Sequence, residues 1–323
     1  MLRPSAVLAN FFLALFSLLN VVVAQQRRTP RVIDYLIHST DTVNAVSGWV
    51  TGLLPDSILP EGMGMDYQYL MKNKEGVFCG INGSGYLYKI SDDKGYLRFH
   101  REDATNFRGH NFFSANFYYG GEIYSLGGYG FWHQNGMLRK YNAFTRDWQP
   151  VIIERERPLM ASINSFFWLD AAAGKIYVNP YVHRLEGFRK SPYVSNDSLL
   201  LSSLDLNTGA WHDLGRMSKT PVMSLQTSFG VVELGVYNAI LYDFKNNRVY
   251  SAGKNLKDKL TRLTPGLNNN LYFYKDSKLF FANLNNDVFD STTLTADDFV
   301  FSGEQLYVNS NTLAGNKGKG SSL

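Results

Sequence analysis

A recurring hairpin signature constrains the fold of this chain more than any other feature. Each copy has an apolar residue, a polar turn rich in Asp, Asn, Thr, Lys or Gly, and a second apolar residue seven positions after the first. A turn of this composition between apolar residues is typical of two adjacent antiparallel strands. Six copies follow one another at intervals of 38 to 63 residues. They begin at Leu36, Ile90, Tyr141, Leu204, Tyr242 and Phe281.

The composition agrees with an all-β protein. The 323 residues include 28 Gly, 20 Tyr and 22 Phe, which favour short strands and tight turns over long helices. Three of the hairpins are preceded by a further predicted strand pair, which would complete a small sheet of four strands. These pairs are residues 66–71 with 77–81, 162–168 with 175–179, and 222–228 with 230–234.

The clearest unit is "GGEIYSLGGYGFWHQNGMLRKYNAFTRDW", residues 120–148. We expect Gly127 and Gly128 to end a strand, and Tyr141 and Trp148 to flank a polar turn. This pattern resembles a kelch repeat, the blade unit of propellers such as the central domain of galactose oxidase. The resemblance implies a β-propeller whose blades each span about 50 residues.

The six hairpins predict six blades. The first hairpin has no strand pair before it, and residues 298–308 form a predicted inner pair with no outer pair after it. We therefore expect N-terminal outer strands to pair with C-terminal inner strands and close the ring, which removes two exposed sheet edges. The predicted organisation is one propeller domain over residues 25–312 and a flexible tail over residues 313–323.

Residues 1–24 have the pattern of a secretory signal peptide. Arg3 precedes an apolar run over residues 7–23, and small residues up to Ala24 suit cleavage. An uncleaved N-terminal anchor stays open as the alternative. No later segment is apolar enough to span a bilayer, so we expect a secreted or periplasmic protein with no membrane span after cleavage. Cys79 is the only cysteine, and we expect it to act as a small buried apolar residue.

One face of the predicted propeller collects the longer loops, and its residue types suit a binding site. Exposed aromatic side chains beside basic and imidazole groups favour a sugar, an acidic ligand or a protein partner. The candidate ligand-binding residues are Arg108, His110, Tyr129, Trp132, His133, Tyr181, His183 and Arg189.

These features predict a monomeric, exported binding module for a carbohydrate or a protein partner. The net charge of +4 arises from 32 basic and 28 acidic residues without a long block of one sign, so no nucleic-acid partner is expected. The six histidines are scattered, and we expect no metal and no cofactor.

The alternative is a sugar-modifying enzyme, an epimerase or one similar to the kelch-type sialate mutarotases. It would use Glu122 and Glu156 as acid and base groups, with Arg155 and Arg157 binding a carboxylate. The sequence contains no recognisable serine, histidine and aspartate motif, and no catalytic residue is assigned.

Overall fold

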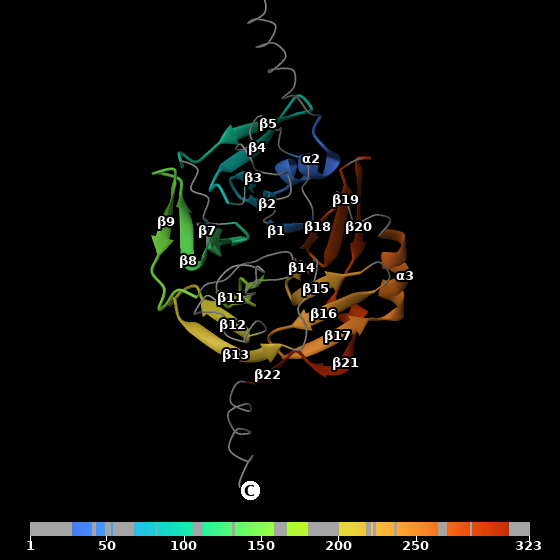
Figure 1. The fold of residues 1–323 in the computed structure, drawn as a ribbon. Helices are drawn as coiled ribbons and strands as arrows, with labels where there is room; N and C mark the ends of the chain where they lie inside the picture. The colour runs from blue at the N-terminus through green and yellow to red at the C-terminus, as the bar shows by residue number, and fades with distance from the viewer. Residues whose placement is uncertain are drawn as a thin grey trace, which may run out of the picture.

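The computed structural model describes residues 28–40, 43–48, 53, 68–81, 83–105, 112–130, 133–157, 167–179, 200–217, 221, 224–235, 238–263, 270–284 and 286–309. They form small antiparallel sheets arranged in a ring as a β-propeller of five blades, with two α-helices (Figure 1). The prediction of an all-β propeller is confirmed, and the prediction of six blades is wrong. The predicted signal peptide and the predicted tail lie outside the described residues.

Two blades have four strands each, in chain order across the sheet. Blade 1 contains β2 (Gln68–Asn73), β3 (Gly76–Ile81), β4 (Leu87–Asp93) and β5 (Tyr96–Arg101). Blade 2 contains β6 (Ala115–Tyr119), β7 (Glu122–Gly130), β8 (His133–Asn142) and β9 (Asp147–Val151).

The next two blades each gain a fifth, outermost strand from the C-terminal region. Blade 3 contains β10 (Phe167–Asp170), β11 (Lys175–Val178), β12 (Leu200–Asp205), β13 (Trp211–Met217) and β22 (Tyr307–Asn309). Blade 4 contains β14 (Ser224–Thr227), β15 (Gly230–Leu234), β16 (Ala239–Asp243), β17 (Arg248–Ala252) and β21 (Phe299–Gln305), which follows the short 3₁₀ helix η2 (Ala296–Asp298).

Blade 5 contains β18 (Asn270–Lys275), β19 (Lys278–Asn283) and β20 (Val288–Thr293). Helix α3 (Lys254–Leu263) precedes it and lies on the outside of the ring (Figure 1). Leu256 and Leu260 of this helix are fully buried in an apolar cluster that blades 4 and 5 share. The helix therefore covers apolar side chains that the two sheets alone would expose.

The ring is closed by the N-terminal strand β1 (Val43–Gly48). It pairs antiparallel with β18 through Ser47 opposite Tyr272, and with β2 through Val46 opposite Leu70. Blades 5 and 1 thereby become one continuous sheet of eight strands.

The predicted closure is wrong, because the N-terminal strand is an inner strand of the ring and the C-terminal strands are outer strands. The N-terminal strand lies between the first strands of blades 1 and 5, whereas the C-terminal strands β21 and β22 pair with the outer strands β17 and β13. Residues 31–38 form helix α2 (Arg31–His38), so the described N-terminal residues contain no outer hairpin. The predicted hairpin beginning at Leu36 is therefore also wrong.

The seven-residue spacing locates the other five hairpins, and in three of them it also gives the correct register. Tyr141 faces Trp148, Leu204 faces Trp211, and Tyr242 faces Val249. The hairpins beginning at Ile90 and Phe281 form with their turns centred one residue later than predicted. Ile90 consequently faces Phe99, and Phe281 faces Asp290. The three predicted inner strand pairs are confirmed as β2 and β3, β10 and β11, and β14 and β15.

The glycine pair of blade 2 does not end its strand. Gly127 and Gly128 lie inside β7, where the pairing with β8 shifts register between Leu126 and Gly128. Their φ values of +71° and +122° are conformations that other residues rarely adopt. The pair therefore forms a β-bulge that bends the strand and lets it continue to Gly130.

Tryptophan indoles tie neighbouring blades together. In each case the indole N–H donates to a main-chain carbonyl of an adjacent blade or of the segment that follows that blade. Such a bond fixes both the distance and the orientation of the two sheets. The donors and acceptors are Trp148 to Gly85 (2.8 Å), Trp211 to Arg155 (2.9 Å) and Trp168 to Thr227 (2.8 Å).

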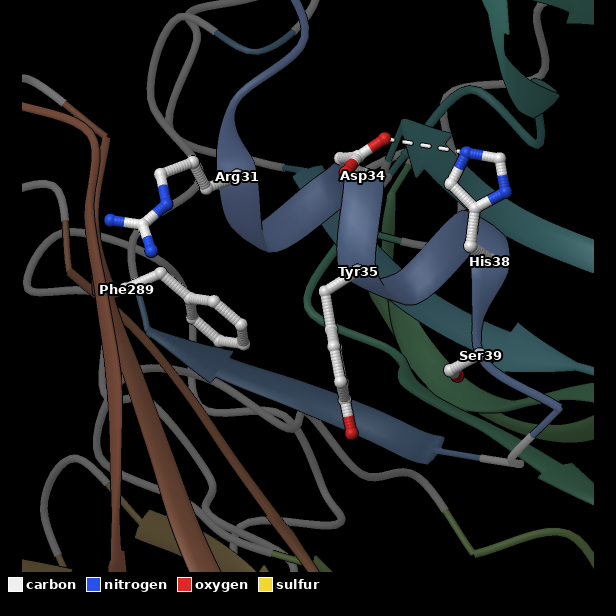
Figure 2. Close-up of a pocket in the computed structure, with 6 residues that line it drawn as sticks. All are labelled: Arg31, Asp34, Tyr35, His38, Ser39 and Phe289. Atoms are coloured by element: carbon white, nitrogen blue, oxygen red, sulfur yellow. Dashed lines mark ion pairs between the residues drawn. The ribbon is translucent and has the colours of Figure 1, made fainter.

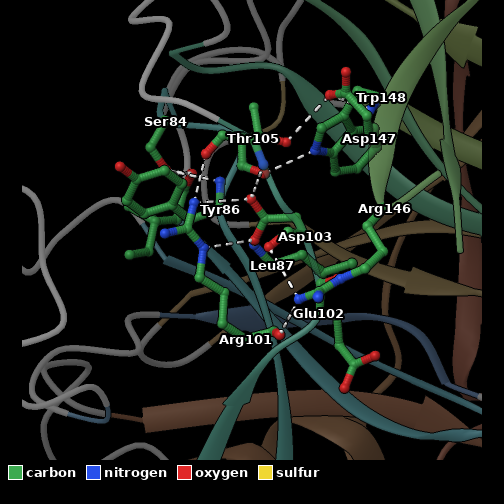
Figure 3. A network of polar contacts seen from close by, with 12 residues as sticks. Ser84, Tyr86, Leu87, Arg101, Glu102, Asp103, Thr105, Arg146, Asp147 and Trp148 are labelled. Carbon is green, nitrogen blue, oxygen red and sulfur yellow. Dashed lines mark hydrogen bonds and ion pairs between the residues drawn. The ribbon is translucent and has the colours of Figure 1, made fainter.

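A buried carboxylate organises the interface between blades 1 and 2 (Figure 3). Asp103, which follows β5, accepts hydrogen bonds from the backbone N–H of Leu87 at 2.7 Å and of Thr105 at 3.0 Å. The guanidinium of Arg101 lies 3.2 Å from the same carboxylate and 3.9 Å from the ring centre of Tyr86. Asp103 thus fixes the chain where it leaves blade 1.

Blade 2 binds to that fixed segment through Arg146. Its guanidinium donates to the carbonyls of Glu102 at 2.6 Å and Arg101 at 2.9 Å, and the hydroxyl of Tyr141 also donates to Glu102 at 2.8 Å. The interface therefore depends on main-chain acceptors that Asp103 holds in place.

We expect Asp103→Ala to lower the free energy of unfolding by about 3 kcal/mol, because it leaves two buried N–H donors and a guanidinium without their acceptor. Urea denaturation followed by tryptophan fluorescence measures the change. Asp93→Ala removes an exposed carboxylate that pairs with Arg98 at 3.0 Å on the same hairpin. This control should change the free energy by less than about 0.5 kcal/mol. Equal effects of the two substitutions would contradict the role assigned to Asp103.

The thiol of Cys79 is fully buried in β3, as predicted, and burial raises its pKa to about 12. We expect iodoacetamide to leave the folded protein unmodified at mildly alkaline pH and to alkylate it fully in denaturant, because only the thiolate reacts. Mass spectrometry of the intact protein measures the modification. Rapid alkylation without denaturant would contradict the burial of this strand.

Candidate functional site

Of the eight predicted site residues, the structure describes Tyr129 and the backbone of His133. Both lie at the end of the β7–β8 hairpin, where Gly130 faces His133 and the backbone of Tyr129 pairs with that of Phe112. The other six lie outside the described residues, so the predicted loop-face site stays a prediction. They are Arg108, His110, Trp132, Tyr181, His183 and Arg189.

A different site is formed by helix α2, at the junction of blades 1 and 5. A pocket of about 450 Å³ opens beside this helix, within the range of about 300–1,000 Å³ that is typical of small-molecule sites. Figure 2 shows its six lining side chains. Four belong to α2, one to the residue that follows this helix, and one to β20. They are Arg31, Asp34, Tyr35, His38, Ser39 and Phe289.

The sequence around the pocket explains why a helix forms there. Pro30 occupies the N-cap position, and Val32, Ile33 and Leu36 form one buried face at helical spacing. Apolar residues at helical spacing are the sequence signal for this helix. The predicted hairpin that begins at Leu36 overlaps this signal.

Hydrogen bonds hold α2 to the outer turns of both blades. The Thr29 hydroxyl donates to Asp92, and the Thr29 N–H donates to the carbonyl of Gly95 at 2.9 Å, both in blade 1. The Arg31 N–H donates to the carboxylate of Asp287, before β20 in blade 5, at 2.7 Å. The helix is therefore fixed to blades 1 and 5, and the pocket beside it is lined by α2, Ser39 and Phe289 of blade 5.

One wall of the pocket is aromatic. The ring centre of Tyr35 lies 5.1 Å from that of Phe289 and 5.4 Å from that of Phe280. Phe280 in turn stacks on Phe273 at 4.8 Å with almost parallel planes. Because each ring is supported by the next, Tyr35 and Phe289 offer a firm apolar surface to a ligand.

The rim of the pocket carries groups that donate and accept hydrogen bonds. Asp34 and His38 lie 3.3 Å apart on the exposed side of α2 (Figure 2). None of the described residues pairs with the Arg31 guanidinium. The hydroxyl of Ser39 is buried and has no hydrogen-bond partner in the described structure. Such a group is stabilised when a ligand or a water supplies the missing partner.

These residue types include those of a serine hydrolase, but the geometry does not activate a nucleophile. The imidazole of His38 is directed at Asp34, and the Ser39 hydroxyl makes no hydrogen bond to it (Figure 2). A nucleophilic serine needs contact with its general base. In the part of the chain that the structure describes, no three His, Cys, Asp or Glu side chains are placed to hold a metal ion.

Three of the four residues of the enzymatic alternative, Glu122, Arg155 and Arg157, have partners within the chain. Arg157 hydrogen-bonds to Asp213, and Arg155 lies 3.8 Å from the same carboxylate. Both arginines therefore pair with the carboxylate of Asp213 in the protein itself rather than with a ligand carboxylate. Glu122 lies 3.4 Å from Lys140 at the start of β7. These groups contribute to contacts within and between blades.

Hydrogen bonds from Arg157 and Ser202 hold the pKa of Asp213 below its ordinary value of 3.8. The carboxylate therefore contributes stability above pH 3.8, and this contribution is lost as the pH falls through the lowered pKa. We expect Asp213→Asn to be less stable than the wild type at neutral pH, with the difference shrinking in acid. Urea titrations across this pH range measure it. A difference independent of pH would contradict the assignment.

No protein-family model matches this chain, and no curated protein is significantly similar to it in sequence. The resemblance to kelch repeats therefore stays a prediction, while the propeller arrangement rests on the structure itself. Neither helix of the described part of the chain has the length and apolar character that crossing a membrane requires.

Proposed function

We propose that this protein is an exported binding module that takes a carbohydrate in the pocket beside α2. The observation that carries the proposal is the combination of an aromatic wall, formed by Tyr35 and Phe289, with a rim of Arg31, Asp34 and His38. The export part rests on the apolar segment at residues 1–24.

The pocket matches the two surfaces that a sugar presents. The C–H face of a pyranose ring is apolar and packs against an aromatic ring, while its hydroxyl groups both donate and accept hydrogen bonds. Tyr35 supplies the ring, the carboxylate of Asp34 accepts, and the guanidinium of Arg31 donates. Since hydrogen bonds hold α2 to blades 1 and 5, little has to be ordered when a ligand binds beside it.

A protein partner is the second candidate, because exposed apolar side chains flank the pocket. Tyr96 and Val288, at the first positions of β5 and β20, are 44% and 43% exposed. Aromatic and apolar side chains at a rim of this kind are typical of protein interaction sites.

The test is a glycan array probed with the wild-type protein and two variants. We expect Tyr35→Ala to weaken the binding of array glycans about tenfold, because it removes the stacking surface. Ile152→Ala removes a side chain that is 96% exposed on blade 2, away from the pocket, and should bind like the wild type.

Wild-type binding by Tyr35→Ala would reject this pocket as the site, and an array without any bound glycan would reject the carbohydrate function. In the second case, loss of a purified partner upon Tyr96→Ala would support the protein-binding candidate. A sugar whose anomeric ratio changes with time in NMR spectra, at a rate that depends on His38, would indicate the sugar-modifying enzyme instead.

A further inference from the structure

We infer that the N-terminal segment is a strap that opens and closes on the ring while the blades stay folded, and that Lys72 beneath it favours the open state. The strap consists of the described residues 28–40 and 43–48, which contain α2 and β1. The inference goes beyond the proposed function, because it concerns the protein without a ligand.

Few main-chain contacts hold the strap. In the described part of the chain, β1 forms two residue pairs with β18 and two with β2, and the ladder with β2 contains a register shift. The ladders between β2 and β3 and between β18 and β19 have six pairs each. Helix α2 adds the hydrogen bonds of Thr29 and Arg31. The strap can therefore leave without breaking any ladder inside a blade.

Strand register places Lys72 under the strap. Lys72 lies opposite Val43 of β1 on one side and opposite Val77 of β3 on the other. Residues directly opposite each other in antiparallel strands project from the same face of the sheet. Val43 and Val77 belong to the apolar cluster that the buried face of α2 completes. Lys72 therefore projects from the face that α2 covers.

The charge of Lys72 is not compensated there. The residue is 4% exposed, and no described residue pairs with its ammonium group. Burial lowers its pKa from the ordinary value of 10.5, and the positive charge of Lys89 lowers it further. The charged residues of α2, Arg31, Asp34 and His38, lie on the exposed side of the helix. The charged form of Lys72 therefore destabilises the closed strap, and opening lets water reach it.

A second polar group beneath the strap lacks a partner. The hydroxyl of Ser39 is buried without a hydrogen bond in the described structure, whereas the buried carboxylate of Asp103 at the next interface is fully paired. Opposing these costs, the buried face of α2 holds the strap closed, with Val32, Ile33 and Leu36 at 2%, 0% and 0% exposure. The open state is therefore a minor one.

Opening of the strap takes the pocket apart. Tyr35 belongs to the strap and Phe289 to blade 5, and their ring centres lie 5.1 Å apart only while α2 is docked. The pocket beside α2 thus exists in the closed state alone. A ligand of this pocket, of any chemical class, would bind the closed state.

The test is native-state hydrogen exchange of the full chain, read by mass spectrometry without ligand. We expect amides of residues 31–38 and 43–48 to exchange at least about tenfold more slowly in Lys72→Met than in the wild type. The reason is that a methionine side chain fills the same space without charge. Lys74→Met is the matched control, because Lys74 is exposed on the same hairpin. Its exchange should equal that of the wild type.

A second variant loosens the strap from the other side. Asp287→Ala removes the carboxylate that accepts the Arg31 N–H at 2.7 Å. We expect faster exchange at residues 31–38 and 43–48 and unchanged exchange in blades 2 to 4. Asp276→Ala is its control, because this carboxylate is 78% exposed at another turn of blade 5.

Strap amides that exchange as slowly as those of β3 in the wild type would overturn the inference, since the strap would then open only on global unfolding. Unchanged strap exchange in Asp287→Ala would overturn it as well. If Lys72→Met disturbs blades 2 to 4, Lys72→Gln decides, because it removes the charge and keeps a side chain of similar size. Strap exchange as fast as in the wild type in that variant would reject the role of Lys72. None of these outcomes bears on the carbohydrate function, because no ligand is present.

Discussion

The pairing of β1 with β18 on one side and β2 on the other is the interaction on which the rest of the ring depends. A propeller is stable only when its first and last blades meet, because open sheet edges cost hydrogen bonds and invite aggregation. Cys79 is the only cysteine, so no disulfide can lock this junction within the chain. Strand pairing and the apolar packing of α2 hold it instead.

The candidate site is a product of that closure. Tyr35 belongs to the N-terminal helix and Phe289 to the last blade, and their ring centres lie 5.1 Å apart beside the junction that β1 closes. Tryptophan bonds fix the spacing of the interfaces from blade 1 to blade 4, with the Asp103 network between blades 1 and 2. Blades 4 and 5 share the apolar cluster that α3 covers. A ligand in the pocket would contact both α2 and β20, so binding would favour the packing of this helix against blade 5.

Local sequence chemistry predicted much of the blade structure and little of the site. The turn composition located five hairpins, and the Tyr141 and Trp148 pair has the predicted register with its rings in edge contact at 5.7 Å. The same rule failed at Leu36, where apolar residues at helical spacing compete with the hairpin pattern. Because the hairpin pattern predicts a strand pair in that segment, the sequence does not predict Arg31, Asp34 and Tyr35 as site residues.

The sequence by itself determined the strand-rich class, the positions of most hairpins and the burial of Cys79, since these follow from turn residues and from the alternation of neighbouring side chains. Only the tertiary structure decided the number of blades, the inner position of β1, the outer positions of β21 and β22, and the pocket. The physical reason is that a strand's partner across the ring depends on which distant edge is left unpaired, and no local pattern encodes that edge.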